Sequence, residues 1–392
     1  MMTAPRTNSA ALVRRELLTR AMLSWLGTAY KRASPAERRC TLVLMQPTPH
    51  RLAFAAGCIS LLVAGAGSSS AAAAQAIKGV PSVPFAPTSI WNRPVAADAA
   101  FADVSAELHG APASPTSVGT DLVTLCASSP RAPLTDVVLS AGWSPAARMT
   151  PTSTVLYRRH LSANACTAVQ TNPFGNALFV LVDPATGLAD TGVGAWRSRG
   201  GPLLSAVPDG PSAHGIDTRT GDGLSGAGRA SGLPAIGGLI RTGEITQGID
   251  HALAVNLPSG VLSAAVHWRW PASSADETAT LTYFGADPAL TMGSLLAVPS
   301  TVNVETIGWH TPQGRILARN AQQYGWYVAD SVPGSQVQFA FETSAARHDL
   351  GLRVNPANGY ETVNPRRLDA SGFTADVMTI LALMQAVTSN AP

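Results

Sequence analysis

The apolar positions of this chain fall in short runs that are rich in β-branched and aromatic residues. Gly, Pro, Asn and Asp bound these runs, and this pattern is typical of β-strands. We expect strands at residues 154–160, 177–183, 251–257, 261–270, 279–284, 324–329 and 337–342. The segment from Asp183 to Gly187 has the composition of a turn between two of them.

Two stretches have the helical pattern instead. Thr311 can cap a helix that begins at Pro312 and runs to about Gln323, with a core face of Ile316, Asn320 and Gln323 or Tyr324. A second helix is expected at about 375–386, with Val377, Ile380, Leu381 and Met384 as its apolar stripe. Many strands, few helices and no strand–helix alternation predict a mainly β protein rather than an α/β sheet. We expect a single β-sandwich or jelly-roll-like domain with a few peripheral helices.

The N-terminal part has the features of an export signal. Residues 52–67 are apolar, His50 and Arg51 precede them, and Ala74 to Ala76 form an Ala-x-Ala cleavage motif. We expect a signal peptide at 45–76 that is cleaved near Ala76, and a secreted protein without a membrane span in its mature part. Residues 1–44 are then a mis-called start or, alternatively, a long basic extension. Residues 77–90 form a Pro-rich lead-in, and 91–392 form the β-rich domain.

Charge and cysteine content follow from this division. The whole chain has a net charge of +3, but residues 1–76 hold nine Lys and Arg against two acids. The remainder has 18 basic and 22 acidic residues, a net charge of −4, which excludes a basic nucleic-acid footprint. Cys126 and Cys166 predict one disulfide in an oxidising compartment, the alternative being two buried free thiols. Its loop of about forty residues is worth roughly 3–4 kcal/mol in the chain-entropy model.

Common cofactor and hydrolase motifs are absent or incomplete. Gly221 to Gly226 match G-x-G-x-x-G but lack the preceding strand and the following helix of a dinucleotide site. The sequence around Ser225 misses the G-x-S-x-G elbow because Ala227 replaces the final glycine. The histidines after residue 76 show no metal-ligand spacing. We expect no cofactor; a structural Ca²⁺ and a metal site assembled from distant residues stay open.

The densest group of ionisable residues lies in a glycine-rich stretch at 231–252. It contains Arg241, Glu244, Asp250 and His251 within an otherwise apolar, charge-poor sequence. His251 can act as acid or base near neutral pH, and Glu244 can act as a carboxylate acid or base. Asp250 and His251 are adjacent at a strand start, so they cannot both face one cleft without a bulge. Structural roles in a sheet and a turn are the alternatives for both residues.

A second group combines aromatic side chains with an acid. The stretch at 324–330 contains Tyr324, Tyr327 and Asp330, and Trp309 and His310 precede the predicted helix. Aromatic rings stack on sugar faces and carboxylates bind sugar hydroxyls, although core packing explains the same rings. The candidate substrate-binding residues are Arg241, Asp250, His310, Trp309, Tyr327 and His214.

Three segments carry a resemblance to a known group. They are residues 89–95, 231–253 and 314–330, and together they resemble a group of secreted bacterial proteins that is common in soil actinobacteria. The resemblance spans most of the mature chain. It implies that Glu244, His251, Tyr324 and Asp330 are the residues to test for a function, but it implies no particular reaction.

These observations predict a secreted, monomeric enzyme that cleaves a polysaccharide. A glycoside hydrolase would use Glu244 and Asp330 as its two carboxylates. A polysaccharide lyase, ranked slightly lower, would use His251 and Tyr324 or Tyr327 to move a proton next to a uronate carboxyl. Glu244, His251, Tyr324 and Asp330 should then border one cleft. The alternatives are a non-catalytic protein that binds a glycan or the cell wall, and a structural envelope protein.

Overall fold

A computed structural model describes residues 80–109, 111–167, 176–207, 213–351, 353–354, 361–362 and 372–389. The predicted signal peptide and the residues before it lie outside these ranges, as does the first part of the lead-in. Within the described ranges, no helix has the length and apolar character needed to cross a membrane.

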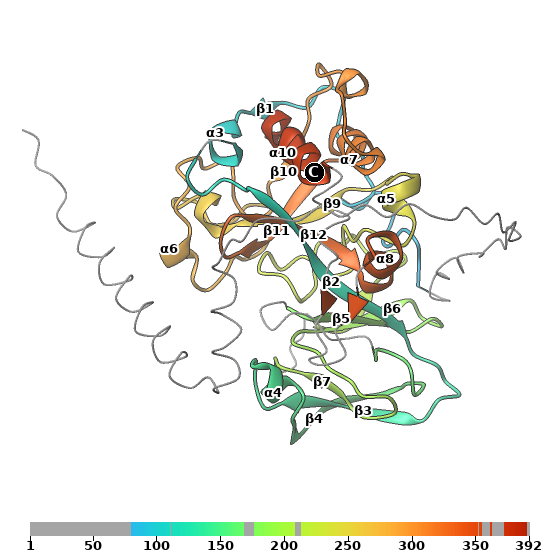
Figure 1. The fold of residues 1–392 in the computed structure, drawn as a ribbon. Coiled ribbons are helices and arrows are strands. Elements are labelled where there is room, and N and C mark those ends of the chain that lie inside the picture. The colour runs from blue at the N-terminus through green and yellow to red at the C-terminus, as the bar shows by residue number, and fades with distance from the viewer. Residues whose placement is uncertain are drawn as a thin grey trace, which may run out of the picture. The chain divides into compact units, whose positions relative to one another are not determined.

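The fold is mainly β, as the sequence predicts, and a ten-stranded sheet dominates it (Figure 1). In sheet order its strands are β1 (Phe101–Ala102), β15 (Gln385–Val387), β10 (Leu295–Ala297), β11 (Trp326–Val332), β9 (Leu253–Pro258), β12 (Gln336–Glu342), β2 (Ser117–Ala127), β5 (Leu178–Val182), β6 (Leu188–Gly192) and β8 (Ile216–Asp217). A three-stranded sheet has the order β4 (Pro151–His160), β3 (Leu134–Ser140) and β7 (Leu203–Ser205). The short strands β13 (Arg353–Val354) and β14 (Glu361–Thr362) pair separately.

The large sheet is mixed, which the sequence pattern does not predict. β9 pairs parallel with β11 and antiparallel with β12, and β2 lies parallel to both β12 and β5. Every residue of β5 and β9 is buried, as expected for strands covered on both faces. The start of β9 therefore lies beside the end of β12, and the ends of β9 and β11 lie together. This arrangement determines which polar residues can meet.

The two larger sheets pack on each other around β5, as in a sandwich. Phe179 and Leu181 face one way and share a cluster with Val137 of β3 and Leu203 of β7. Val180 and its alternate neighbours face the opposite way, into a separate apolar cluster. Adjacent side chains of β5 point to opposite faces of the large sheet. One face therefore packs against the three-stranded sheet, and the other packs against loop segments.

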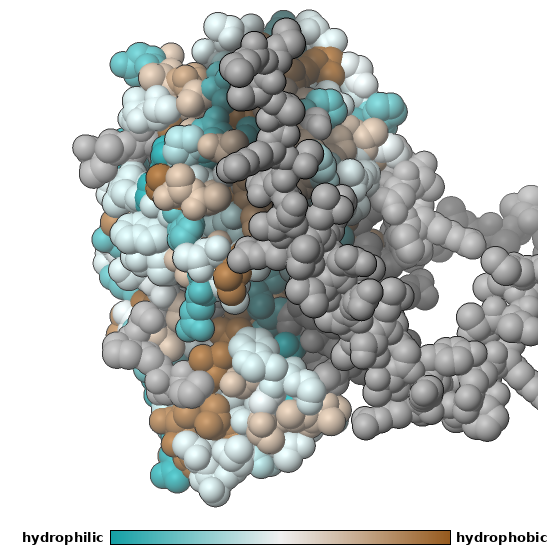
Figure 2. Space-filling view, turned by 90° about the vertical axis from the view of Figure 1, so that its left-hand side faces the viewer, coloured by the Kyte–Doolittle hydropathy of each residue, from teal (hydrophilic) through white to brown (hydrophobic). Residues whose placement is uncertain are grey.

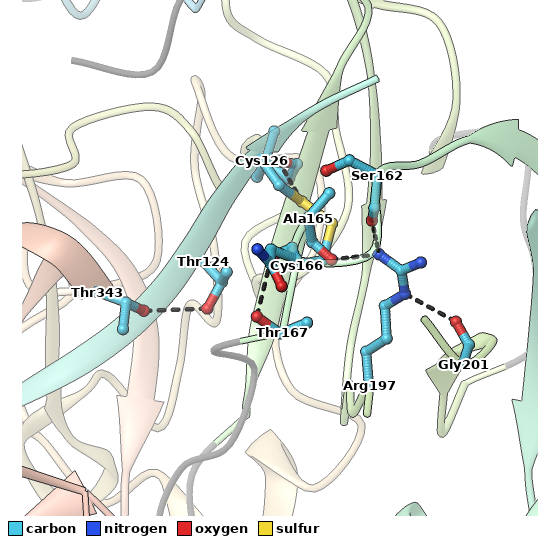
Figure 3. The surroundings of a disulfide bond; sticks show 11 residues. Thr124, Cys126, Ser162, Ala165, Cys166, Thr167, Arg197, Gly201 and Thr343 are labelled. Atoms are coloured by element: carbon cyan, nitrogen blue, oxygen red, sulfur yellow. Dashed lines mark hydrogen bonds between the residues drawn. A yellow bond between two sulfur atoms is a disulfide. The ribbon is translucent and has the colours of Figure 1, made fainter. Parts of the chain in front are cut away.

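The predicted disulfide is present and belongs to the same inter-sheet cluster. Cys126 at the end of β2 is bonded to Cys166, 40 positions later in the sequence (Figure 3). Beside it, the buried Arg197 donates hydrogen bonds to the backbone carbonyls of Ser162, Ala165 and Gly201 (Figure 3). The guanidinium ties two loops together around the covalent link.

The two predicted helices form, with corrected details. In α7 (Pro312–Gln323), the Thr311 hydroxyl accepts a hydrogen bond from Gly314 N at 2.9 Å, as a helix cap does. Its buried side chains are those of Leu317, Ala318, Asn320 and Ala321, whereas Gln323 is exposed, so the core face is rotated from the predicted one. Helix α10 (Phe373–Leu383) buries the predicted apolar stripe but ends early, because the next residues pair as β15.

Two predicted strands are wrong, and several strands were missed. The segment predicted at 261–270 follows the short helix η2 (Ser259–Val261) and makes only isolated bridges within the described chain. The segment predicted at 279–284 contains the short helix α6 (Ala279–Thr282). The helix begins with hydrogen bonds from the backbone N–H groups of Leu281 and Thr282 to Thr278 O. The missed strands include β2, whose first residues are polar, as well as β3 and β6. The remaining short helices are α3 (Ser105–Leu108), α4 (Pro145–Arg148), α5 (Glu244–Gln247), η3 (Val304–Thr306) and α8 (Thr343–Asp349).

Candidate functional site

The strand β9 separates two groups of polar residues. Glu244, His251 and Tyr324 lie at its start, where Leu253 N donates to Gly325 O at 3.1 Å. Asp330 lies toward its other end, where its Cα pairs with that of Asn256, the fourth of the six residues of β9. The rise of an extended chain separates the two ends by roughly 15 Å. The structure therefore brings three of the four predicted catalytic residues to one end and places Asp330 at the other.

Glu244 and His251 form an ion pair in which His251 is buried and the Glu244 side chain is 19% exposed. Glu244 begins α5 after Gly243, which has a positive φ of 88°, and its Oε2 accepts from Arg241 N at 2.7 Å. The same oxygen lies 3.2 Å from Nε2 of His251, whose Nδ1 lies 2.9 Å from Ala252 O. A carboxylate and a carbonyl only accept, so both ring nitrogens donate when the imidazole is protonated.

The electrostatics of this pair agree with its hydrogen bonds. Burial by itself lowers the pKa of His251, but the hydrogen bond and charge of Glu244 outweigh it, and the pKa is raised. A histidine with both N–H groups engaged has no lone pair to accept a substrate proton. This geometry does not supply the base that the lyase hypothesis assigns to His251.

Arg241 has a structural role beside this pair. Its Nε donates to Glu342 Oε2 at 2.8 Å and its Nη1 donates to Pro81 O at 2.9 Å. Both charged side chains are less than a tenth exposed. Arg241 thus holds the lead-in against the end of β12 and does not project into solvent. Asp250 is exposed. The partial burial of the nearby Tyr324, together with the negative charge of Asp250, raises the pKa of the Tyr324 hydroxyl.

Trp309 and His310 lie together at the start of α7. The Trp309 indole N–H donates to Val304 O at 2.8 Å. Asp376 of α10 accepts from the backbone N–H of His310 at 2.8 Å, and its Oδ1 lies 2.9 Å from the ring Nδ1. The His310 side chain is 59% exposed. Their contacts join α7 to α10 and η3.

The other two predicted substrate-binding residues lie elsewhere. Tyr327 is buried, with its ring edge-on to Trp91 at 5.4 Å between centroids. His214 lies 2.8 Å from Asp190 of β6. The six predicted substrate-binding residues are therefore distributed over several parts of the fold.

The group at the end of β9 is a cluster of carboxylates, which we call the carboxylate cluster: Asp121, Asp276 and Asp330, together with Arg229 and Asn256. Asp121 Oδ2 accepts from Asn256 Nδ2 at 3.3 Å and from Arg229 Nη1 at 3.4 Å. Asp330 follows a register irregularity in β11 that turns its side chain to the face of Asn256. Asp121, Arg229, Asn256 and Asp330 are all buried.

Asp276 is the more accessible member of the cluster. It lies before α6, is half-buried, and its Oδ2 accepts from the hydroxyl of Tyr283 at 2.6 Å. The ring of His267 packs edge-on against Tyr283 at 5.7 Å. Asp276 therefore links the buried carboxylates to the surface of the 263–293 segment.

The charges in the cluster perturb one another. Burial raises the pKa of Asp330 to about 7, and the charges of Asp121 and Asp276 add to this. The backbone N–H of Ser331, which donates to Oδ1 at 2.8 Å, and the charge of Arg229 oppose it. Burial also raises the pKa of Asp121. Near neutral pH, Asp330 is thus poised between its acid and its carboxylate form, as catalytic acids often are.

Two polar atoms in the cluster have unused hydrogen-bonding capacity. Among the described residues, Asn256 Oδ1 and Arg229 Nε are buried without a partner, and both side chains contact the same oxygen of Asp121. Buried polar atoms of this kind call for an explanation. An acceptor and a donor side by side can together bind one hydroxyl group or one water.

Sequence reasoning found one member of this cluster and missed the others. Asp330 was found because it follows an aromatic strand. Asp121 and Asn256 carry a usable signal, because each is a polar residue inside an apolar strand that is otherwise buried. Arg229 and Asp276 lie in loops, and nothing in their local sequence distinguishes them.

Neither a metal centre nor a known relative identifies the site. Within the described ranges, no group of three or more His, Cys, Asp and Glu is suited to hold a metal ion. No protein-family model, no curated protein and no solved structure matches this chain.

Proposed function

We propose that this protein is a secreted glycoside hydrolase that cleaves a polysaccharide, with Asp330 as its general acid. The observation that carries the proposal is a buried carboxyl group whose pKa is raised to about 7 beside two further carboxylates. Glycosidases use one carboxylic acid kept protonated by its environment and one ionised carboxylate. The disulfide supports an oxidising compartment.

Asp276 is the better partner for Asp330 than Glu244. Glu244 lies at the other end of β9 and is already bonded to His251 and to the backbone of Arg241. Asp276 interacts electrostatically with Asp330, reaches the surface and is oriented by Tyr283. Asp330 would protonate the leaving glycosidic oxygen as its bond to the anomeric carbon breaks. Asp276 would take a proton from the water that bonds to that carbon, or would attack the carbon itself.

The hydrolase is favoured over the lyase by the state of His251. A lyase needs a base with a free lone pair next to the uronate, and both nitrogens of His251 already lie within hydrogen-bond distance of Ala252 O and Glu244 Oε2. The buried carboxyl at the end of β11 offers an acid for hydrolysis without any rearrangement of this pair.

A digestion panel tests the proposal. The protein, produced with its disulfide, is incubated with neutral and uronate-containing polymers while new reducing ends and the ultraviolet absorbance of unsaturated uronates are followed together. We expect reducing ends without absorbance, and a rate that falls as pH rises through about 7, because the acid must be protonated. Asp330→Asn and Asp276→Asn should each lower kcat by about 10²-fold or more.

Glu244→Gln is the matched control, because it alters a carboxylate outside the carboxylate cluster. It should keep most of the activity if the protein stays folded. Absorbance with the reducing ends would show a lyase instead, and activity that persists in Asp330→Asn would remove the assigned acid. The absence of reducing ends across the panel would reject the hydrolase and favour a non-catalytic glycan-binding protein, for which the exposed tryptophans described next are the supporting observation.

A further inference from the structure

The segment that carries Asp276 also exposes several large apolar side chains. Trp268 is 48% exposed, Trp270 36% and Phe284 71%. We call these three residues the aromatic surface. Large rings held in water are costly unless they meet a partner, and a contiguous exposed apolar patch commonly marks a binding site. Figure 2 shows the side of the molecule on which α6 lies in Figure 1, where apolar residues (brown) are interspersed with polar ones (teal and white).

The two tryptophans face the same way. Along 266–270 the exposure alternates: Val266, Trp268 and Trp270 are exposed, whereas His267 and Arg269 are half-buried. Side chains two residues apart in an extended segment lie on one side of it. Trp268 lies in an isolated bridge with Met292 and Trp270 in the turn that follows, so the two exposed indole rings, two residues apart in the chain, form a short row.

The row is fixed to the strand that carries Asp330. Arg269 N donates to Met292 O at 2.9 Å, and Met292 N donates to His267 O at 3.2 Å. The next residue, Gly293, donates from its backbone N to Val328 O of β11 at 2.8 Å. The Arg269 guanidinium also donates to Pro288 O at 2.7 Å. Because these contacts hold the segment in place, a ligand that stacks on the rings need not order it.

A second path leads from the row to the carboxylates. His267, between the exposed residues, packs against Tyr283, and the hydroxyl of Tyr283 bonds to Asp276. Asp276 acts electrostatically on Asp330. The aromatic surface and the carboxylate cluster are thus neighbours through side chains as well as through backbone.

The charge of the segment selects among ligands. Residues 263–293 contain Asp276, Glu277 and Asp287 against the single basic residue Arg269, a net charge of −2 with His267 neutral. A polyanionic chain would be repelled here, whereas a neutral chain pays no such cost. We propose that the aromatic surface binds a neutral polysaccharide, whose sugar faces stack on Trp268 and Trp270, and leads it to the carboxylate cluster. The delivery of the chain to the carboxylate cluster rests on the proposed function, whereas the binding of a neutral polysaccharide to the aromatic surface does not.

The test is affinity electrophoresis in native gels that contain one soluble polymer each: mannan, mixed-linkage β-glucan, arabinogalactan, xylan or, as the anionic probe, polygalacturonate. Asp330→Asn serves as the parent, so that no polymer is cut during the run. At least one neutral polymer should retard the parent, and polygalacturonate should not. Trp268→Ala and Trp270→Ala should each raise the apparent Kd by about tenfold or more, as anchor residues of a binding surface do.

Trp143→Ala is the matched control. Trp143 is 46% exposed, nearly as much as Trp268, but it lies after β3 in the three-stranded sheet. Its replacement should leave the retardation unchanged, and circular dichroism melts should show all variants folded. Equal effects of Trp143→Ala and Trp268→Ala, or no retardation by any neutral polymer, would overturn the inference.

The outcomes separate this inference from the proposed function. Trp-dependent retardation without any polymer cleavage by the wild-type chain would uphold the aromatic surface and reject the hydrolase. Cleavage of a neutral polymer with an unchanged KM in Trp268→Ala and Trp270→Ala would uphold the hydrolase and reject the aromatic surface. Preferential retardation by polygalacturonate would reject the neutral substrate class.

Discussion

Replacing Asp330 by asparagine should stabilise the protein above neutral pH. Asp330 is 6% exposed and lies near Asp121 and Asp276, so its ionisation adds a negative charge beside two other carboxyl groups, which the charge of Arg229 only partly offsets. Asparagine has nearly the same shape and keeps an oxygen that can accept from Ser331 N. It removes the charge and keeps the side-chain shape, but its amide nitrogen replaces Oδ2, so the hydrogen bond that Asp330 accepts from Asn176 Nδ2 at 3.3 Å is lost.

The magnitude follows from proton linkage. The pKa of Asp330 is about 7 in the folded protein, against an ordinary value of 3.8 for an aspartate in water. The folded state holds this proton more tightly, so stability is unaffected at low pH, falls as pH rises from about 4, and is lowest above about 7. A difference of about three pKa units corresponds to about 4 kcal/mol of unfolding free energy.

Urea unfolding at pH 5 and pH 8 measures this effect. The wild-type free energy of unfolding should be lower at pH 8 than the Asp330→Asn value by a few kcal/mol, and the gap should be much smaller at pH 5. Asp98→Asn, at an exposed aspartate, should match the wild type at both pH values. The gain in stability would also separate the expected loss of activity from misfolding.

Two results would refute the reasoning. If Asp330→Asn is less stable than the wild type at pH 8, the carboxylate is stabilised by Arg229 more than burial penalises it. If the two proteins change in parallel between pH 5 and pH 8, Asp330 does not titrate in this range, and its role as the acid fails with it.

Three further predictions concern groups outside the carboxylate cluster. Cys126→Ser opens the loop of 40 positions and should lower the unfolding free energy by about 4 kcal/mol, a loss that reductant reproduces in the wild type in urea titrations. Arg241→Ala leaves a buried carboxylate without its partner and should cost about 3–5 kcal/mol, whereas Arg158→Ala, from an exposed pair, should cost less than about 1 kcal/mol in the same assay. Because the folded pKa of His251 is raised, the ion pair with Glu244 should stabilise the fold below about pH 6.5 and weaken as pH rises past it. Glu244→Gln should reverse that pH dependence in unfolding experiments, because burial without the carboxylate lowers the pKa of His251, and an unchanged dependence would assign it to another group.

Local chemistry explains the elements that sequence reasoning predicted well. Thr311 and Pro312 specify the start of α7 within a single turn of chain, because a hydroxyl cap and a fixed φ act on adjacent residues. The strands β5, β9 and β12 were predicted because their apolar runs lie between turn residues. The 261–270 segment has the composition of a strand, but it makes only isolated bridges and exposes its two tryptophans at the surface, so it does not join a sheet.

The candidate site was predicted in part for the same reason. Glu244 and His251 are seven positions apart and meet across one short helix, so their proximity could be anticipated. Asp121 is 108 positions from Arg229 and 135 from Asn256 in the sequence. No local sequence pattern predicts that these three side chains are in contact. The structure places Glu244 and Asp330 toward opposite ends of the paired strands β9 and β11, a placement that local sequence does not encode.

The sequence by itself determined the strand-rich class of the fold, the cap of α7 and the cysteine pair, since each depends on residue type and short spacing. The tertiary structure alone decided that β9 runs parallel to β11 and antiparallel to β12. Strand direction depends on hydrogen bonds between segments far apart in the chain, which local propensity does not encode. That choice placed Asp330 beside Asn256 and Asp121 in a buried site, where the lack of water raises its pKa, and left Glu244 with His251 at the opposite end.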